Sequence, residues 1–111
     1  MGIEPSWADK GAAFSDKSAR NEFGITQDFI IDGIRSGSLQ FRENHIHGNP
    51  YFRLFRHEVE ALVVKEYGSD YLENKKVQNE LKEINSELRK MKSRQKTLEK
   101  RKAELEAMLK E

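Results

Sequence analysis

Hydrophobic residues recur every three to four positions between residues 15 and 37 of this 111-residue chain, which is the spacing of helices. Ser15 and Thr26 are typical N-cap residues, because their short side chains accept hydrogen bonds from the first turn of a helix. Gly24 and Gly37 follow the two apolar runs, where a left-handed residue often ends a helix. The pattern therefore predicts two short helices joined by a tight turn.

Residues 39–55 carry a different pattern, which is typical of strands. Leu39 and Phe41 alternate with polar residues, and residues 51–55 form a more continuously apolar run. Between the two runs, the sequence "ENHIHGNP" is rich in turn-forming residues. The segment predicts a hairpin of two strands, at residues 39–42 and 51–55, around a polar loop. A third helix follows and ends at Gly68.

From residue 70 onward the chain contains no glycine or proline, and apolar residues alternate at spacings of four and three. This is the heptad repeat of a coiled coil, in which a helix buries its a and d positions against a partner helix. The helix is otherwise polar on all sides, so we expect it to form a homodimer. The alternative is a solvated single helix. The seam has d positions at Val77, Ile84, Met91, Leu98 and Leu105, and a positions at Leu81, Leu88, Gln95, Lys102 and Leu109.

Two seam positions are polar, Gln95 and Lys102, and such residues lower stability while helping to fix the register and a low number of strands. In a parallel dimer the g residues attract the e residues of the partner helix, in the pairs Glu87–Lys92, Arg94–Glu99 and Arg101–Glu106. An antiparallel dimer has attractive pairs too, Glu87–Arg94 and Glu80–Arg101. Both orders remain open, and the flanking charges slightly favour the parallel one.

Together these elements predict a mainly α protein with a small winged helix-turn-helix domain, a two-stranded antiparallel hairpin and a long C-terminal coiled-coil helix. We expect residues 1–13 to form a flexible N-terminal tail, residues 14–68 the winged helix-turn-helix domain, and residues 69–111 the dimerisation helix. Trp7 in the tail either docks on the domain or stays free.

Composition limits what this chain can be. With 36% hydrophobic residues, it has enough apolar material for one small domain and an extension. No apolar run reaches the roughly 20 residues of a membrane span, and the N-terminus lacks the pattern of a secretory signal. The absence of cysteine excludes disulfides and permits a reducing compartment. We therefore expect a cytoplasmic protein, associated with the nucleoid if its source is bacterial or archaeal.

The net charge of +1 hides a difference between the two parts of the chain. Residues 1–68 carry 8 basic and 10 acidic residues, whereas residues 69–111 carry 12 basic and 9 acidic ones. The long helix also contains a basic run, "RKMKSRQKTLEKRK", with eight basic residues and one acid. This run is either a solvated coil surface or a second patch that contacts phosphates.

The order and spacing of the motifs in the first part resemble the excisionase-type and MerR-type helix-turn-helix superfamily. The resemblance covers about residues 14–66, and its pieces are Gly24-Ile25-Thr26, Gly37-Ser38-Leu39, Tyr51 with Arg53, and the run from Arg56 to Leu62. Phage terminase small subunits are similar in following such a domain with a dimerising helix. The DNA-binding domain of the xeroderma pigmentosum repair protein is similar at Asn49-Pro50, Leu54-Phe55, Val59-Glu60 and Tyr67-Gly68. The resemblance implies binding of double-stranded DNA, with the second helix in the major groove and the hairpin on the backbone or minor groove.

The second helix departs from the pattern of that superfamily. MerR regulators usually carry an arginine and aromatic residues in its middle, where this chain has Ile31, Asp32 and Gly33. Asp28 and Asp32 would repel phosphates, and the first basic residue of the helix is Arg35. We therefore expect the arginines around the hairpin to hold DNA. The full set of expected DNA-contacting residues is Lys17, Arg20, Thr26, Gln27, Arg35, Arg42, Asn44, His45, His47, Asn49, Arg53 and Arg56.

Residue patterns for catalysis or metal binding are scarce. His45 and His47 form an H-x-H pair, but the next candidate ligands are Glu43 and His57, so we expect no closed four-ligand metal site. No phosphate-cradling glycine-rich loop and no nucleophile motif are present. We expect a DNA-binding protein that is not an enzyme and uses no cofactor and no metal. The alternative is a protein–protein interaction module that keeps the fold without binding DNA.

Overall fold

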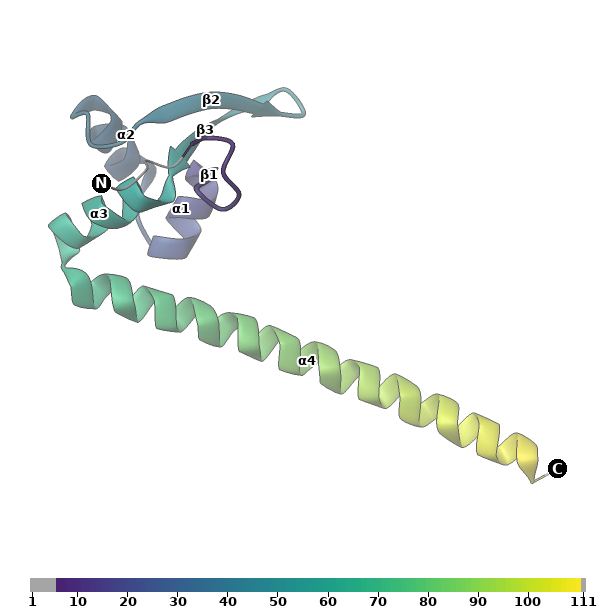
Figure 1. Ribbon diagram of the computed structural model, residues 1–111. Coiled ribbons are helices and arrows are strands. Elements are labelled where there is room, and N and C mark those ends of the chain that lie inside the picture. The colour runs from purple at the N-terminus through teal and green to yellow at the C-terminus, as the bar shows by residue number, and fades with distance from the viewer. Residues whose placement is uncertain (1–5, 111) are drawn as a thin grey trace. The chain divides into compact units, whose positions relative to one another are not determined.

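The computed structural model describes residues 6–110, and most of these residues are helical. In chain order the elements are β1 (Ala13–Ser15), α1 (Asp16–Phe23), α2 (Gln27–Arg35), β2 (Phe41–Ile46), β3 (Asn49–Phe55), α3 (Arg56–Tyr67) and α4 (Ser69–Leu109) (Figure 1). The chain divides into two compact units, the first ending at Lys76 and the second beginning at Val77. The long helix α4 begins at Ser69, as the sequence predicts, but its first residues belong to the first compact unit.

The capping residues that the sequence predicts fix the two short helices. The Ser15 side chain accepts a hydrogen bond from the backbone N–H of Ser18, and the Thr26 side chain accepts one from Phe29. Gly24 follows α1 in the left-handed conformation, with φ of 66°. The two helices and the short turn between them are therefore confirmed.

The predicted two-stranded antiparallel hairpin is present as β2 and β3, and a third strand that the sequence did not predict extends it into a three-stranded sheet. β1 lies antiparallel to β3, with Phe14 opposite Leu54, and β3 lies between β1 and β2 (Figure 1). The carbonyl of Ala12 also accepts a hydrogen bond from the backbone of Arg56, where α3 begins. β1 has only three residues, which is too short for an alternating pattern to be recognised in the sequence.

Part of the predicted flexible tail is ordered against this sheet. The ring of Trp7 stacks on the ring of Phe55, with 4.0 Å between the centroids. Ala13 already belongs to β1, so the domain begins before residue 14. Residues 1–5 of the predicted tail lie outside the described residues.

The hairpin is longer than predicted and its loop is shorter. β2 continues to Ile46 and β3 begins at Asn49, so most of the sequence "ENHIHGNP" is paired strand. Only His47 and Gly48 form the turn, with φ of 51° and 82°. Two successive residues with positive φ are typical of the type I′ turn, whose twist matches that of the flanking strands.

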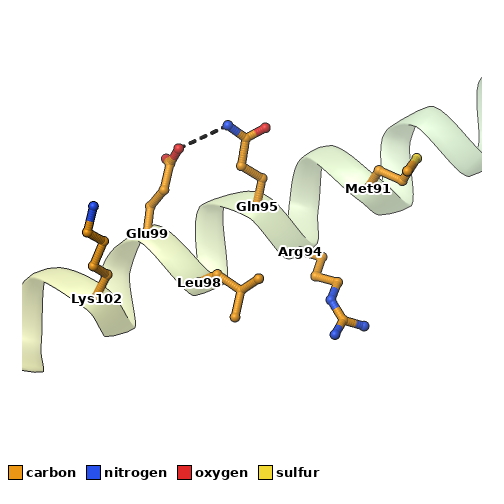
Figure 2. Close-up of a pocket in the computed structure, with 6 residues that line it drawn as sticks. All are labelled: Met91, Arg94, Gln95, Leu98, Glu99 and Lys102. Carbon is orange, nitrogen blue, oxygen red and sulfur yellow. Dashed lines mark hydrogen bonds between the residues drawn. The ribbon is translucent and has the colours of Figure 1, made fainter.

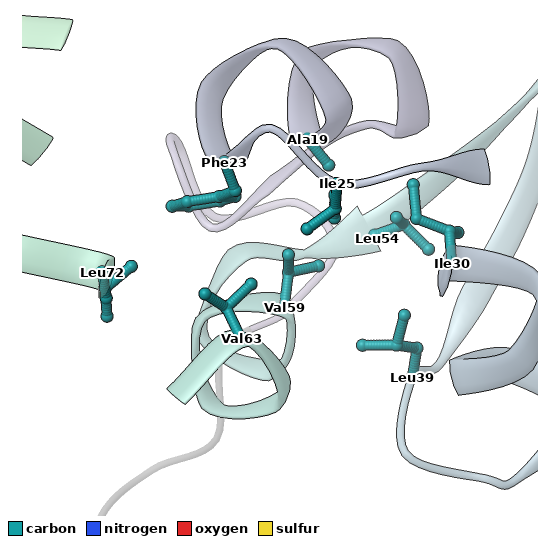
Figure 3. Packing of buried hydrophobic residues seen from close by; sticks show 9 residues of the cluster. All are labelled: Ala19, Phe23, Ile25, Ile30, Leu39, Leu54, Val59, Val63 and Leu72. Carbon is teal, nitrogen blue, oxygen red and sulfur yellow. The ribbon is translucent and has the colours of Figure 1, made fainter. Parts of the chain in front are cut away.

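One apolar cluster holds the first unit together (Figure 3). Its buried members come from all four helices, from β3 and from two connecting segments: Ala19, Phe23, Ile25, Ile30, Leu39, Leu54, Val59, Val63 and Leu72. Full burial of a large apolar side chain contributes about 1.5–3 kcal/mol. Leu39, expected in the first hairpin strand, is a core residue that precedes this strand.

The start of α4 packs on the domain through aromatic side chains. The hydroxyl of Tyr71 donates a hydrogen bond of 2.6 Å to the carbonyl of Phe23, the last residue of α1. The Tyr71 ring lies 4.8 Å from that of Tyr67, which stacks on Phe29 of α2 at 5.6 Å. Leu72 joins the core, so the start of α4 completes the first unit.

Candidate nucleic-acid interface and helix seam

The two faces of the hairpin β2–β3 carry different side chains. Residues opposite one another in an antiparallel pair point to the same face, and this face alternates along each strand. One face carries the buried Leu54 with its neighbours Phe41, Phe52, Glu43, Pro50 and His45. The opposite face, here called the outer hairpin face, carries Arg42, Asn44 and Ile46 from β2 and Arg53, Tyr51 and Asn49 from β3.

Arg42 and Arg53 are direct cross-strand neighbours on the outer hairpin face. Like charges in this relation destabilise a sheet. Neither arginine forms an ion pair with a carboxylate within residues 6–110. The guanidinium group of Arg42 lies over the ring of Trp7, 5.2 Å from its centroid. The outer face thus concentrates positive charge that no described carboxylate neutralises.

Two aromatic residues that the predicted site lacks border this pair of arginines. Tyr51 lies opposite Asn44 on the outer hairpin face. The ring of Trp7 contacts both the ring of Phe55 and the guanidinium group of Arg42. The sequence could have indicated Tyr51, because side chains two residues apart in a strand share a face and Tyr51 stands two residues before Arg53. Trp7 gives no local signal, because its contacts are made with residues far along the chain.

Arg20 and Gln27, both expected to contact DNA, are engaged with a buried carboxylate. Asp16 is only 8% exposed, and it accepts a hydrogen bond of 3.1 Å from the side-chain amide of Gln27. Arg20 donates to the amide oxygen of Gln27, and its guanidinium lies 3.7 Å from the Asp16 carboxylate. These contacts join α1 to the start of α2, so both side chains have a structural role.

Thr26 and Arg56 are also engaged within the domain. The hydroxyl of Thr26 caps α2. Arg56 forms an ion pair with Glu22 of α1, and its guanidinium lies 4.5 Å from the centroid of the Phe14 ring. Each of these side chains would have to give up an internal contact in order to reach DNA.

The remaining predicted contact residues are scattered over the surface. Lys17 on α1 and Arg35 at the end of α2 are exposed. His45 is on the face of the hairpin opposite the two arginines, and His47 is in the turn. Within residues 6–110, no group of three or more histidine, aspartate or glutamate residues could hold a metal ion. Of the twelve expected residues, only Arg42, Asn44, Asn49 and Arg53 share the outer hairpin face.

The surface of α2 is acidic. Asp28 and Asp32 are both exposed, and Arg35 is the one basic residue of the helix. A groove of about 470 Å³ lies between α2 and α3, lined by Phe29, Asp32, Gly33, Ser36, Ser38, Leu62, Lys65, Glu66 and Tyr67. This surface combines carboxylates with partly exposed apolar side chains.

The second unit exposes the apolar seam that the heptad pattern predicts. The eight apolar seam residues range from 44% exposed at Leu105 to 87% exposed at Leu109. Met91 and Leu98 line a shallow groove of about 340 Å³ on the surface of α4, with Arg94, Gln95, Glu99 and Lys102 around them (Figure 2). Gln95 donates a hydrogen bond of 3.0 Å to Glu99. A helix with this much exposed apolar surface is stabilised when a partner covers the seam.

Comparisons with protein-family models, with curated proteins and with solved structures find no match. Among residues 6–110, no helix is both long enough and apolar enough to cross a membrane. The chemistry of the outer hairpin face and of α4 is therefore the basis for assigning a function.

Proposed function

We propose that this protein is a winged-helix DNA-binding protein, in which the hairpin β2–β3 is the wing. The observation that carries the proposal is the pair Arg42 and Arg53, which are adjacent on the outer hairpin face and form no ion pair with a carboxylate of residues 6–110. The planar guanidinium group donates two parallel hydrogen bonds to a phosphate, and close phosphates would offset the repulsion between the two arginines. Asn44 and Asn49 on the same face add uncharged donors. The resemblance of residues 14–66 to excisionase-type and MerR-type domains supports the same class of partner.

In this proposal the hairpin, rather than α2, supplies most of the affinity. The exposed carboxylates of Asp28 and Asp32 repel phosphates. A carboxylate can accept a hydrogen bond from N4 of cytosine, so α2 can still contribute to sequence preference. The side chains of Thr26 and Gln27 at the start of α2 are already engaged within the domain.

We further propose that α4 forms a parallel coiled-coil homodimer. The exposed apolar seam supports a partner helix, and a second copy of the same helix supplies a matching seam. In the parallel order the flanking charges attract in the pairs Glu87–Lys92, Arg94–Glu99 and Arg101–Glu106. A dimer carries two hairpins, and two linked contacts with one duplex raise the overall affinity.

The test is a salt titration of the full chain against duplex DNA of about 30 base pairs, followed by fluorescence anisotropy between about 50 and 200 mM NaCl. The double variant Arg42→Gln/Arg53→Gln should bind at least about tenfold more weakly. Its plot of log K against log[salt] should be shallower by about two for each hairpin on the duplex, because each lost phosphate contact removes about 0.9. When both hairpins of the dimer contact one duplex, the change should be about 3.6.

Two matched variants separate the position of the charge from its amount. Lys10→Gln/Lys65→Gln removes the same charge from exposed positions outside the hairpin, and it should keep the slope of the parent. Arg42→Lys/Arg53→Lys keeps the charge and should keep most of the slope, with some loss of affinity because lysine cannot form the bidentate contact. Equal losses in the Arg42→Gln/Arg53→Gln and Lys10→Gln/Lys65→Gln variants would exclude the hairpin as the site.

A protein–protein interaction module is the second candidate, and the acidic groove between α2 and α3 favours it. The groove offers Asp32 and Glu66 beside Phe29 and Tyr67, a combination that suits a basic segment with apolar anchors. If the parent chain binds no duplex at about 50 mM NaCl, the DNA-binding proposal fails and this candidate takes its place.

A further inference from the structure

One face of α4 carries five cations over a long stretch, with the carboxylates of Glu99 and Glu104 at its borders. Residues three and four positions apart share a helix face. A row of residues on α4 follows this spacing and is here called the basic ridge. It consists of Lys82, Asn85, Arg89, Lys92, Lys96, Lys100 and Ala103. At 1.5 Å per residue, the cations from Lys82 to Lys100 extend over about 27 Å of helix. At 3.6 residues per turn, the ridge lies roughly 130° around the helix from the apolar seam.

The carboxylates nearest to the ridge are engaged with side chains that do not belong to it. The contacts are Glu104 with Arg101 at 3.2 Å, Glu106 with Lys102 at 3.8 Å, and Glu99 with Gln95 at 3.0 Å. None of the five ridge cations forms an ion pair within the described part of the chain. Arg101 and Lys102 are thus neutralised within their own helix, whereas the ridge cations are not. In the proposed parallel dimer, Lys92 alone of the ridge would face a carboxylate, Glu87 of the partner helix.

We propose that the basic ridge is a second nucleic-acid-binding surface, which contacts the phosphate backbone of duplex DNA without reading its sequence. Lysine suits this role, because a flexible point charge can follow phosphates in many arrangements. The favourable free energy comes largely from counterions that the duplex releases when the cations bind. The inference takes its class of partner from the proposed function but rests on different residues, so each can fail separately.

The chemistry of the ridge favours nucleic acid over a membrane surface. A helix that lies in a membrane interface has an apolar face with large side chains that insert between lipids, flanked by its cations. Across the ridge from Lys82 to Ala103 the only apolar residue is Ala103, and the large apolar residues are in the seam on the other side. A row of cations without apolar anchors matches the backbone of a duplex, which presents one negative charge about every 1.7 Å of its axis.

The test compares two fourfold variants of the full chain that remove equal charge. The ridge variant replaces Lys82, Arg89, Lys96 and Lys100 with glutamine, and the control replaces Lys10, Lys65, Lys90 and Lys110, which lie outside the ridge. Glutamine, lysine and arginine have similar helix propensities, so both variants should keep the parent's circular dichroism. The probe is the duplex of about 30 base pairs, titrated between about 50 and 200 mM NaCl.

The ridge variant should bind at least about tenfold more weakly than the parent, with a salt slope shallower by about two to three. The control should keep the slope of the parent. Replacing Lys82, Lys96 and Lys100 with arginine keeps the charge and should keep the slope. If the fourfold ridge variant loses helix content, Lys96→Gln/Lys100→Gln provides a milder test with about half the change in slope.

Four outcomes separate the inference about the ridge from the proposal about the hairpin. A ridge variant with the slope of the parent excludes the ridge while leaving the hairpin proposal intact. A loss of slope in the ridge variant but not in Arg42→Gln/Arg53→Gln supports the ridge and excludes the hairpin. A parent that binds no duplex excludes both. Binding of the parent to vesicles rich in phosphatidylserine, lost in the ridge variant and without any binding to DNA, would replace the nucleic acid by a membrane surface.

Discussion

At the scale of single residues, Gly33 allows α2 to approach its neighbours closely. A Cβ at this position would lie 2.8 Å from Cδ1 of Leu39 and 2.8 Å from Cδ2 of Leu62. Carbon atoms do not approach so closely without repulsion. The packing thus gives a structural reason for a glycine in the middle of α2.

Gly33→Ala should lower the free energy of unfolding by roughly 1 kcal/mol. Overpacking a filled core costs about 1–3 kcal/mol, and the higher helix propensity of alanine offsets up to about 1 kcal/mol of this. Urea denaturation measures the difference. In a Leu62→Ala background the same substitution should cost less, because one of the two obstructing side chains has been removed. An increase in stability in both backgrounds would contradict the close packing.

At the scale of elements, the turn of the hairpin contains an unfavourable residue. His47 has φ of 51°, a conformation that costs a residue other than glycine about 1–2 kcal/mol. Asparagine tolerates this conformation better, and Asn-Gly is a preferred pair in type I′ turns. Gly48, the second turn residue, already has the preferred identity.

His47→Asn should therefore raise the free energy of unfolding by about 0.5 kcal/mol, a gain typical of improved turn residues. The measurement is the midpoint of thermal unfolding. The control is His45→Asn, which changes the same side chain within the extended strand β2, where asparagine is unfavourable. A lower midpoint for His47→Asn than for His45→Asn would show that the turn has another conformation in solution.

The elements also differ in how well the sequence predicts them. The caps of α1 and α2 depend on side chains within three residues of the backbone groups that they bind, so a local pattern was enough to find them. The predicted bounds of the hairpin loop were wrong. Asn44 and Pro50 are turn-forming residue types, yet both are held in paired strands. Cross-strand hydrogen bonding and packing outweighed the local preference of these residues.

At the scale of the whole molecule, α4 contributes to both compact units. Tyr71 and Leu72 complete the first unit, and the residues from Val77 onward form the second. Cutting the chain where α4 begins would therefore remove part of the core, whereas a cut after Lys76 would spare it.

A chain that ends at Lys76 should fold and sediment as a monomer, while the full chain sediments as a dimer. A chain that ends at Ser69 should be less stable by about 2–5 kcal/mol, the usual cost of removing a buried leucine. Sedimentation equilibrium and urea denaturation measure the two effects. If the chain ending at Lys76 still sediments as a dimer, the coiled-coil proposal is wrong.

The sequence alone determined the helices, their caps and the heptad stripe of α4. These features depend on residues a few positions apart, whose spacing decides which side chains meet on one helix. Only the tertiary structure decided which of the expected DNA-contacting residues share a surface. It brought Arg42 and Arg53 together across two strands, placed Trp7 against Phe55, and engaged Arg20 and Gln27 with Asp16. These contacts join residues from different elements, and only folding of the chain brings them within reach of one another.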